Sequence, residues 1–312
     1  MAGTRKTAVA VVLAAVALTA TACNDSNGDG RNAAPAAPTT AGAQAAAPSS
    51  AASSEAASKP TKVTPAVYLE QVTQKTGAAK SAKIDEVITV GAVTIKGKGA
   101  VGWSDGLEAD LTMDLSGSPM AKVLEPVTGG PSVRYLYTKD AMYMRLGGQM
   151  VQSGGGPHWV RFDKADMAKA TGGSTDQLQN ADPVQGVRTL IASGKVAEVG
   201  PETVNGKATT HYSGTLSVAD MAKASGQGVT ADQLDQIKQK LTGAGITSDQ
   251  VDVWVDADQL VVKRTERSET KAGPLNVSVT YSDYGTPVIA SEPADFIDFG
   301  DLDQYMKDDA TS

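Results

Sequence analysis

Alternation of apolar and polar residues limits the fold of this 312-residue chain more than any other feature. In Leu107–Leu115 every second residue is apolar, as in a strand with one buried and one solvated face. The same alternation recurs in four further segments: Val133–Tyr137, Met142–Leu146, Val251–Val255 and Leu275–Tyr281. The pattern predicts about ten strands in a meandering, strongly curved antiparallel sheet.

Turn residues between the apolar runs support this interpretation. Asp105-Gly106, Lys139-Asp140 and Asn205-Gly206 each separate two runs of strand character. Asn-Gly is the strongest of these signals, because both central residues of a tight two-residue hairpin turn need a positive φ. The sequence therefore predicts hairpin connections, which join neighbouring antiparallel strands.

Helix signals are fewer and occur at three places. Thr64-Pro65 and Asp182-Pro183 each combine an N-cap residue with a proline suited to the first helical position. Thr230 and Gln233 form a capping-box pattern before a third apolar stripe. Each expected helix has one apolar stripe, so all three should lie on the same apolar side of the sheet. The fold class predicted is α+β, one curved sheet with helices on one side.

The N-terminal fifth of the chain has a different composition. No aromatic residue precedes Tyr68, and residues 24–62 consist mainly of Ala, Pro, Ser and Thr. Such a segment buries too little apolar surface to offset its ordering entropy. We interpret residues 23–62 as a disordered tether and residues 63–312 as a single folded domain with an acidic C-terminal tail.

The first 22 residues have the pattern of a secretory signal peptide. Arg5 and Lys6 precede the apolar run Ala8–Leu18, which is too short to span a membrane. Cys23, the single cysteine, follows directly, and the residues before it resemble a bacterial lipobox. This pattern predicts an exported lipoprotein held at the outer face of the cell membrane by palmitate or a similar acyl chain on Cys23. Ala20-Thr21-Ala22 also fits an ordinary cleavage site, which would leave a secreted protein with a free thiol.

Charge excludes one class of partner. Residues 63–312 contain 23 Lys and Arg and 32 Asp and Glu, a net charge of −9. A domain of this charge has no basic face for nucleic acid, and an anionic membrane repels it. The lipid on Cys23 is therefore expected to provide the contact with the membrane.

No catalytic or metal-binding motif stands out. His158 and His211 lie in strand-like segments without a partner motif, and we interpret both as ordinary polar strand residues. Gly97–Gly102 satisfies G-x-G-x-x-G, but the next residues predict a turn and a strand instead of the helix that binds a dinucleotide. We therefore expect no enzyme activity, no metal and no cofactor.

Three stretches carry a resemblance to a known family. They are Val199–Gly206 continuing to Tyr212, Val253–Asp256 with Val262 and Arg264 downstream, and Tyr281–Val288. These motifs are similar to those of the actinobacterial envelope lipoproteins LppX, LprA, LprF and LprG. The resemblance implies a half-open antiparallel barrel with helices on its concave side, as in the LolA and LolB carriers. It also implies binding of the acyl chains of a lipid or lipoglycan between sheet and helices, as a carrier or chaperone working with an unidentified export partner.

The alternating strands and helix stripes supply candidate residues for such a lipid cavity. They are Leu111, Met113, Leu115, Tyr135, Tyr137, Met142, Met144, Val187, Leu190, Ile191, Leu234 and Ile237. Methionine suits variable acyl shapes because its thioether is flexible. A closed core would use the same residues, so an anchored interaction, scaffold or sensory lipoprotein without a ligand remains the alternative.

Overall fold

The computed structural model describes residues 64–148, 151, 157–164, 181–224, 230–302 and 304–305. The signal peptide, the tether and Cys23 lie outside these residues. The strands are β1 (Ser81–Val90), β2 (Val93–Gly102), β3 (Glu108–Gly117), β4 (Ser132–Tyr137), β5 (Ala141–Arg145), β6 (Trp159–Asp163), β7 (Ala197–Val204), β8 (Lys207–Ser217), β9 (Ser248–Asp256), β10 (Val261–Thr270), β11 (Gly273–Ser282) and β12 (Phe296–Asp298). The helices are α1 (Pro65–Ala78), α2 (Met120–Thr128), α5 (Pro183–Ala192), α6 (Val218–Ala224) and α7 (Ala231–Gly243), with a 3₁₀ turn, η2, at Phe299–Asp301.

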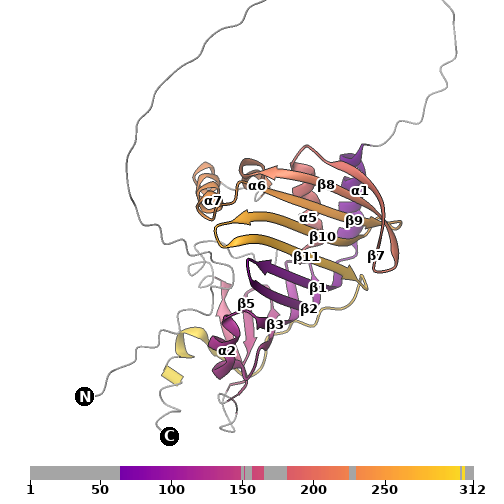
Figure 1. The fold of residues 1–312 in the computed structure, drawn as a ribbon. Helices are drawn as coiled ribbons and strands as arrows, with labels where there is room; N and C mark the ends of the chain where they lie inside the picture. Colours follow the sequence, from indigo (N-terminus) through magenta and orange to yellow (C-terminus); the bar gives the residue numbers. More distant parts are fainter. Residues whose placement is uncertain are drawn as a thin grey trace, which may run out of the picture. The chain divides into compact units, whose positions relative to one another are not determined.

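The described strands form one curved sheet in the order β12-β6-β5-β4-β3-β2-β1-β11-β10-β9-β8-β7 (Figure 1). All neighbours are antiparallel except β12 and β6, which run parallel. The meander β1–β6 joins the meander β7–β11 through the pairing of β1 with β11. The sheet does not close, because β7 and β12 stand at its two edges. The predicted antiparallel, strongly curved sheet is confirmed, with twelve strands in place of about ten.

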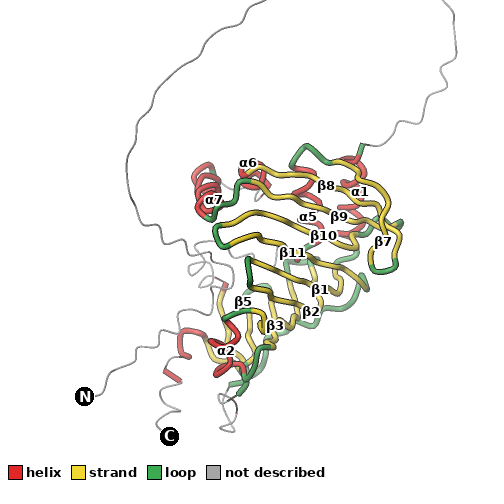
Figure 2. The backbone as a smooth tube through the Cα atoms, in the orientation of Figure 1, coloured by secondary structure: helices red, strands yellow, loops and turns green. Residues whose placement is uncertain are grey.

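The helices cover one face of this sheet, which we call the inward face. In Figure 2, α1 and α5 lie on the same side of β8–β10. Helix α6 contacts β8 and β9. Leu69 and Val72 of α1 and Val187 and Leu190 of α5 pack with inward residues of the sheet in one buried cluster. Burial of one such side chain contributes roughly 1.5–3 kcal/mol. The predicted placement of helices on the concave side is confirmed.

The capping residues act as the sequence predicts. The Thr64 hydroxyl accepts from the Val67 N–H at 3.4 Å, and the Asp182 carboxylate accepts from the Val184 N–H at 2.8 Å. Both helices begin with the expected proline. Asn205 and Gly206 have φ angles of 50° and 79° and form the tight turn between β7 and β8. Local sequence thus determines where these elements begin.

Two helices were not predicted. Helix α2 lies in Ser116–Pro131, where several Pro and Gly residues favour a loop. Pro126 lies inside the helix. Tertiary burial of Leu124 against the inward face stabilises this helix despite its poor propensity. Helix α6 begins directly after β8, where the Asp220 carboxylate accepts hydrogen bonds from the Ser217 N–H and hydroxyl.

The acidic segment near the C-terminus is partly ordered. Phe296–Asp298 forms β12 beside β6, and Leu302 is buried. Asp298 accepts a hydrogen bond from Arg161 at 3.0 Å, and Asp295 pairs with His158. In residues 295–302 the acidic side chains Asp295, Asp298 and Asp301 are exposed, while apolar residues between them are buried or partly buried against the sheet. Residues 303 and 306–312 lie outside the described part.

Candidate functional site

The strand residues proposed for a lipid cavity share the inward face. Leu111, Met113 and Leu115 alternate along β3, and the register of the next strands continues this set. Leu111 lies opposite Tyr135, while Tyr135 and Tyr137 lie opposite Met144 and Met142. The period-2 pattern therefore assigned these side chains to the correct face.

These candidates divide between two packed clusters. Leu111, Val187 and Leu190, with Ile191 beside them, belong to the cluster under α1 and α5. Leu115, Met142 and Met144, with Met113 and Tyr135 beside them, belong to the cluster under α2. Tyr137 packs against both. The structure thus places seven of the twelve candidates on the inward face of the sheet and three more on α5, which packs against that face.

Leu234 and Ile237 are not part of this arrangement. Both lie on α7, are partly buried and belong to neither described cluster. Helix α7 contacts α6, which itself packs against β8 and β9. The apolar stripe of α7 was recognised from its spacing, but spacing does not show which surface a helix covers.

Tyr135 and Tyr137 combine two properties. Each side chain is half-buried and retains some solvent-exposed area. Burial nevertheless raises the pKa of Tyr135 to about 12, and raises the pKa of Tyr137 well above its usual value. Their rings lie 6.4 Å apart. The two rings are therefore strongly desolvated and still not fully covered by protein atoms.

A charged cluster, absent from the sequence-based candidates, lies on the same face. Its centre is Arg264 of β10, which is 2% exposed and donates from Nη1 to the Glu266 carboxylate at 2.9 Å. Helix α5 accommodates it with Gly186, where an added Cβ would lie 2.2 Å from Arg264 Cδ. Glu86 of β1 and Tyr281 of β11 complete the group, which we call the Arg264 cluster. The sequence signal for this cluster was Arg264 itself, a charged residue at an inward position of β10.

Burial affects the acidic groups around Arg264. Desolvation raises the pKa of Glu86, and the charge of Arg264 opposes this rise. Desolvation, followed by the charge of Glu266, raises the pKa of Asp249 to about 7, although Ser268 donates a hydrogen bond to it at 2.7 Å. Burial also raises the pKa of Asp182. The inward face thus contains carboxyl groups that are costly to ionise.

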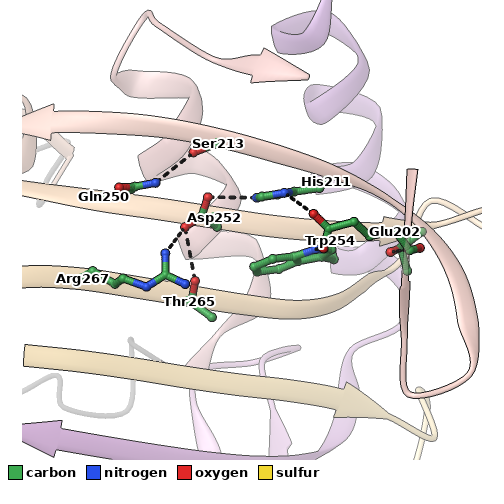
Figure 3. Close-up of polar contacts among 9 residues, drawn as sticks. Glu202, His211, Ser213, Gln250, Asp252, Trp254, Thr265 and Arg267 are labelled. Carbon is green, nitrogen blue, oxygen red and sulfur yellow. Dashed lines mark hydrogen bonds and ion pairs between the residues drawn. The ribbon is translucent and has the colours of Figure 1, made fainter. Parts of the chain in front are cut away.

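The opposite, outward face carries a second polar group (Figure 3). His211 of β8 lies between two carboxylates, with Nδ1 2.9 Å from Glu202 of β7 and Nε2 2.9 Å from Asp252 of β9. Arg267 of β10 donates to Asp252 at 2.7 Å. The His211 ring stacks on Trp254 at 4.3 Å, and the Trp254 N–H donates to Glu202 at 2.7 Å. This network connects four strands.

The geometry of the His211 network suits a structural role better than a catalytic one. Both ring nitrogens of His211 face carboxylates, so neither is available to deprotonate a nucleophile. Burial alone would raise the pKa of Asp252, but hydrogen bonds from Ser213 and His211 and the charge of Arg267 bring it below its usual value. A carboxylate held in its charged form ties the strands together. His211, Glu202 and Trp254 all come from the motifs that carried the family resemblance.

Three further observations concern other kinds of site among the described residues. Within them, no group of three or more His, Cys, Asp or Glu side chains is placed to hold a metal ion. No helix among them is long and apolar enough to cross a membrane. An open depression of about 280 Å³ is lined by Gln71, Gln74, Lys75 and Gln259, whose polar side chains do not suit an acyl chain.

Comparison with known proteins identifies relatives in Streptomyces. No family model matches the chain. It is 42% identical over 249 residues, covering 78% of this chain and 81% of the relative, to the "Uncharacterized 31.2 kDa protein in rplA-rplJ intergenic region" of Streptomyces griseus. It is 32% identical over 305 residues, 96% of either chain, to the "Putative lipoprotein SCO4650" of Streptomyces coelicolor.

Solved structures with similarity to the chain include two mycobacterial lipoproteins. LppX of Mycobacterium tuberculosis is 12% identical, with a TM-score of 0.43, and the match covers 73% of this chain and 100% of LppX. LprF of Mycobacterium bovis is 17% identical, with a TM-score of 0.39, and the match covers 72% and 97%. Both names belong to the group that the strand motifs resemble.

The fold defines the class as an α+β protein with an unclosed antiparallel sheet and helices on its inward face. At 32% identity over nearly its whole length, the chain belongs to the lipoprotein family of its Streptomyces coelicolor relative. Its location is accordingly the cell envelope, as an exported, lipid-anchored protein.

Proposed function

We propose that this envelope lipoprotein binds acyl chains of a lipid or lipoglycan between the inward face and the helices, and acts as a carrier or chaperone without enzyme activity. The observation that carries the proposal is the apolar, methionine-bearing inward face between sheet and helices, on which Met113, Tyr135 and Tyr137 are only half-buried. Ligand sites for apolar molecules are lined by such hydrophobic and aromatic side chains.

The surroundings of these rings suit an acyl chain. Met113, Met142 and Met144 are neighbours on adjacent strands, and their flexible thioethers can adapt to ligands of different shape. Gly97 of β2 pairs with Met113 of β3. Because Gly97 has no side chain, the Met113 thioether lies directly over it. An apolar, adaptable surface with few polar groups matches the chemistry of a lipid.

Lipid analysis tests this proposal. The chain should be purified from its native envelope, and non-covalently bound lipid should be extracted and identified by mass spectrometry. We expect stoichiometric lipid with the wild type and a loss of about tenfold with Met113→Trp, which enlarges a half-buried inward side chain. Val123→Trp, a matched change at a side chain that is 54% exposed, should retain the lipid.

The alternative function has its own support and a distinct outcome. Leu111, Leu115, Met142 and Met144 are all buried, as they would be in a closed core. Wild-type protein that carries no lipid and binds no fluorescent fatty acid would contradict the carrier proposal. That result would favour an anchored interaction, scaffold or sensory lipoprotein.

The proposed attachment is through Cys23, after removal of residues 1–22. Two or three acyl chains on this cysteine, at about 0.8 kcal/mol per buried methylene, would hold the protein stably at the outer face of the membrane. Residues 23–62 would act as a flexible tether with a typical span of roughly 35 Å. This length keeps the acidic domain clear of the anionic lipid surface.

Metabolic labelling tests the anchor. Cells fed radioactive palmitate should label the wild-type protein, whereas Cys23→Ala should carry no label and should move from the membrane fraction to the soluble fraction. Ser26→Ala, a neighbouring change in the same segment, serves as the control and should label normally. Equal absence of label from all three proteins would contradict lipidation at Cys23.

A further inference from the structure

The Arg264 cluster is assembled by strand register. Arg264 of β10 lies opposite Val279 of β11, and Val279 lies opposite Glu86 of β1, so the two charged residues occupy one row across three strands. Tyr281 follows two residues after Val279 and therefore points to the same face. Arg264, Glu86 and Glu266 all act electrostatically on the Tyr281 hydroxyl. The register therefore places Tyr281 on the face that carries Arg264 and Glu86, with its hydroxyl within reach of their charges.

The cluster contains a buried hydroxyl that has no hydrogen bond to any described residue. The Tyr281 hydroxyl is buried without a partner among these residues, in a side chain that is 3% exposed. The Glu86 side chain in the same cluster is 8% exposed; burial raises the pKa of its carboxyl, and the charge of Arg264 opposes this rise. A buried polar group without a partner costs roughly 1–3 kcal/mol. Such groups in a native interior call for an additional partner.

The charges in the cluster indicate the nature of that partner. One guanidinium is surrounded by Glu86, Glu266 and Asp249, and Asp182 at the start of α5 adds a fourth carboxyl. A phosphate would meet more negative than positive charge here. A hydroxyl group meets none of this repulsion, because it donates to a carboxylate and accepts from Tyr281 or Arg264.

The cluster adjoins the site proposed for acyl chains. Glu86 acts electrostatically on Tyr137, the residue that packs against both apolar clusters. Gly97, opposite Glu86 on β2, adds no side chain between them. A ligand lying along Tyr137 would therefore bring any polar group of its own to Glu86 and Tyr281.

We propose that Glu86, Tyr281 and Arg264 form a polar subsite that binds an uncharged hydroxyl group carried by the lipid, either on its glycerol or along an acyl chain. This inference rests on the proposed lipid binding. It assigns to the Arg264 cluster a selective role, whereas the apolar residues around Tyr137 bind acyl chains without selection. The subsite discriminates against phosphate and against the same lipid with its hydroxyl capped.

Competition against a fluorescent fatty acid, with the purified full-length chain, tests the subsite. The probes are dipalmitoylglycerol, its acetate and its phosphate for a glycerol hydroxyl, and methyl hydroxystearate with methyl stearate for a chain hydroxyl. We expect the hydroxyl-bearing member of one pair to bind about fivefold to tenfold more tightly than its partner. The pair that shows the preference identifies the source of the hydroxyl. The phosphate should bind more weakly than dipalmitoylglycerol.

Variants then assign the preference to the cluster. Tyr281→Phe should remove most of the preference and leave the melting temperature unchanged or slightly higher, because the lost hydroxyl has no partner among the described residues. Glu86→Met, which removes the carboxyl group proposed to accept from the ligand hydroxyl, should also reduce the preference. Tyr143→Phe is the control: its buried hydroxyl donates to Glu292 at 2.6 Å on the outward face, so the variant should lose stability and keep the preference.

Each outcome has a separate meaning. Equal affinity for both members of each pair, or tighter binding of the phosphate, would overturn the hydroxyl subsite and leave lipid binding in place. A preference that survives both Tyr281→Phe and Glu86→Met would also overturn it. Failure of every probe to compete would overturn the proposed lipid binding, and the subsite with it.

Discussion

Arg264→Met should destabilise the protein by about 3–5 kcal/mol at pH 8, the cost of leaving buried carboxylates without their counter-charge. Methionine keeps most of the stem that packs against Gly186, so the loss reports the missing charge more than a cavity. Glu266, which pairs with Arg264 at 2.9 Å, loses its partner directly. Chemical denaturation monitored by tryptophan fluorescence measures the change.

The loss should depend on pH in a defined direction. The folded pKa of Asp249 is about 7 and its ordinary value is 3.8, so folding favours the protonated form between these values. The free-energy penalty for ionising buried Asp249 is absent below pH 3.8 and complete above about pH 7. Stability therefore falls as the pH rises through this range. The charge of Arg264 lowers the pKa of Asp249, so its removal raises that pKa further. Arg264→Met should therefore reduce the free energy of unfolding less at about pH 5 than at pH 8.

Two comparisons separate charge compensation from general disruption. Arg267→Met removes a half-exposed cation from Asp252 on the outward face and should cost only about 1 kcal/mol, with a smaller pH dependence. The double change Arg264→Met with Glu266→Leu should recover part of the stability, because it removes an unpaired charge. If Arg264→Met is as stable as the wild type at pH 8, charge compensation does not hold the cluster together.

Gly99→Ala should cost about 3 kcal/mol or more, because its new methyl group has no space. Gly99 has a φ of 155°, and a Cβ there would lie 2.0 Å from the carbonyl oxygen of Asp110 on β3. The clash is with backbone, so relief requires separation of β2 from β3 at the pairing of Gly99 with Leu111. A lowered denaturation midpoint would report the effect.

Gly130→Ala is the matched control for that change. No heavy atom lies within 4 Å of a Cβ at Gly130, so the substitution should alter stability by less than about 0.5 kcal/mol. Hydrogen exchange should further show faster exchange in β2 and β3 for Gly99→Ala alone. Equal stability of the two variants would mean that β2 can move away from β3 without loss of the pairing.

Local patterns predicted much of the fold and part of the site. Alternation in β3, β4 and β5 assigned Met113, Tyr135 and Met144 to one face, because side chains alternate across any strand. The same reasoning did not place Leu234, since an apolar stripe does not specify which surface it covers. It also gave Arg264 and His211 no role, because their partners lie on strands that are distant in the sequence.

The sequence by itself determined the local elements of this protein. Thr64 and Asp182 cap their helices, Asn205-Gly206 turns its hairpin and alternation sets the face of each strand, all through contacts within a few residues. Only the tertiary structure decided that β1 pairs with β11, which brings Glu86 near Arg264 across the sheet. Pairing of distant strands depends on the packing of the whole chain, and the polar subsite proposed here exists only because of that pairing.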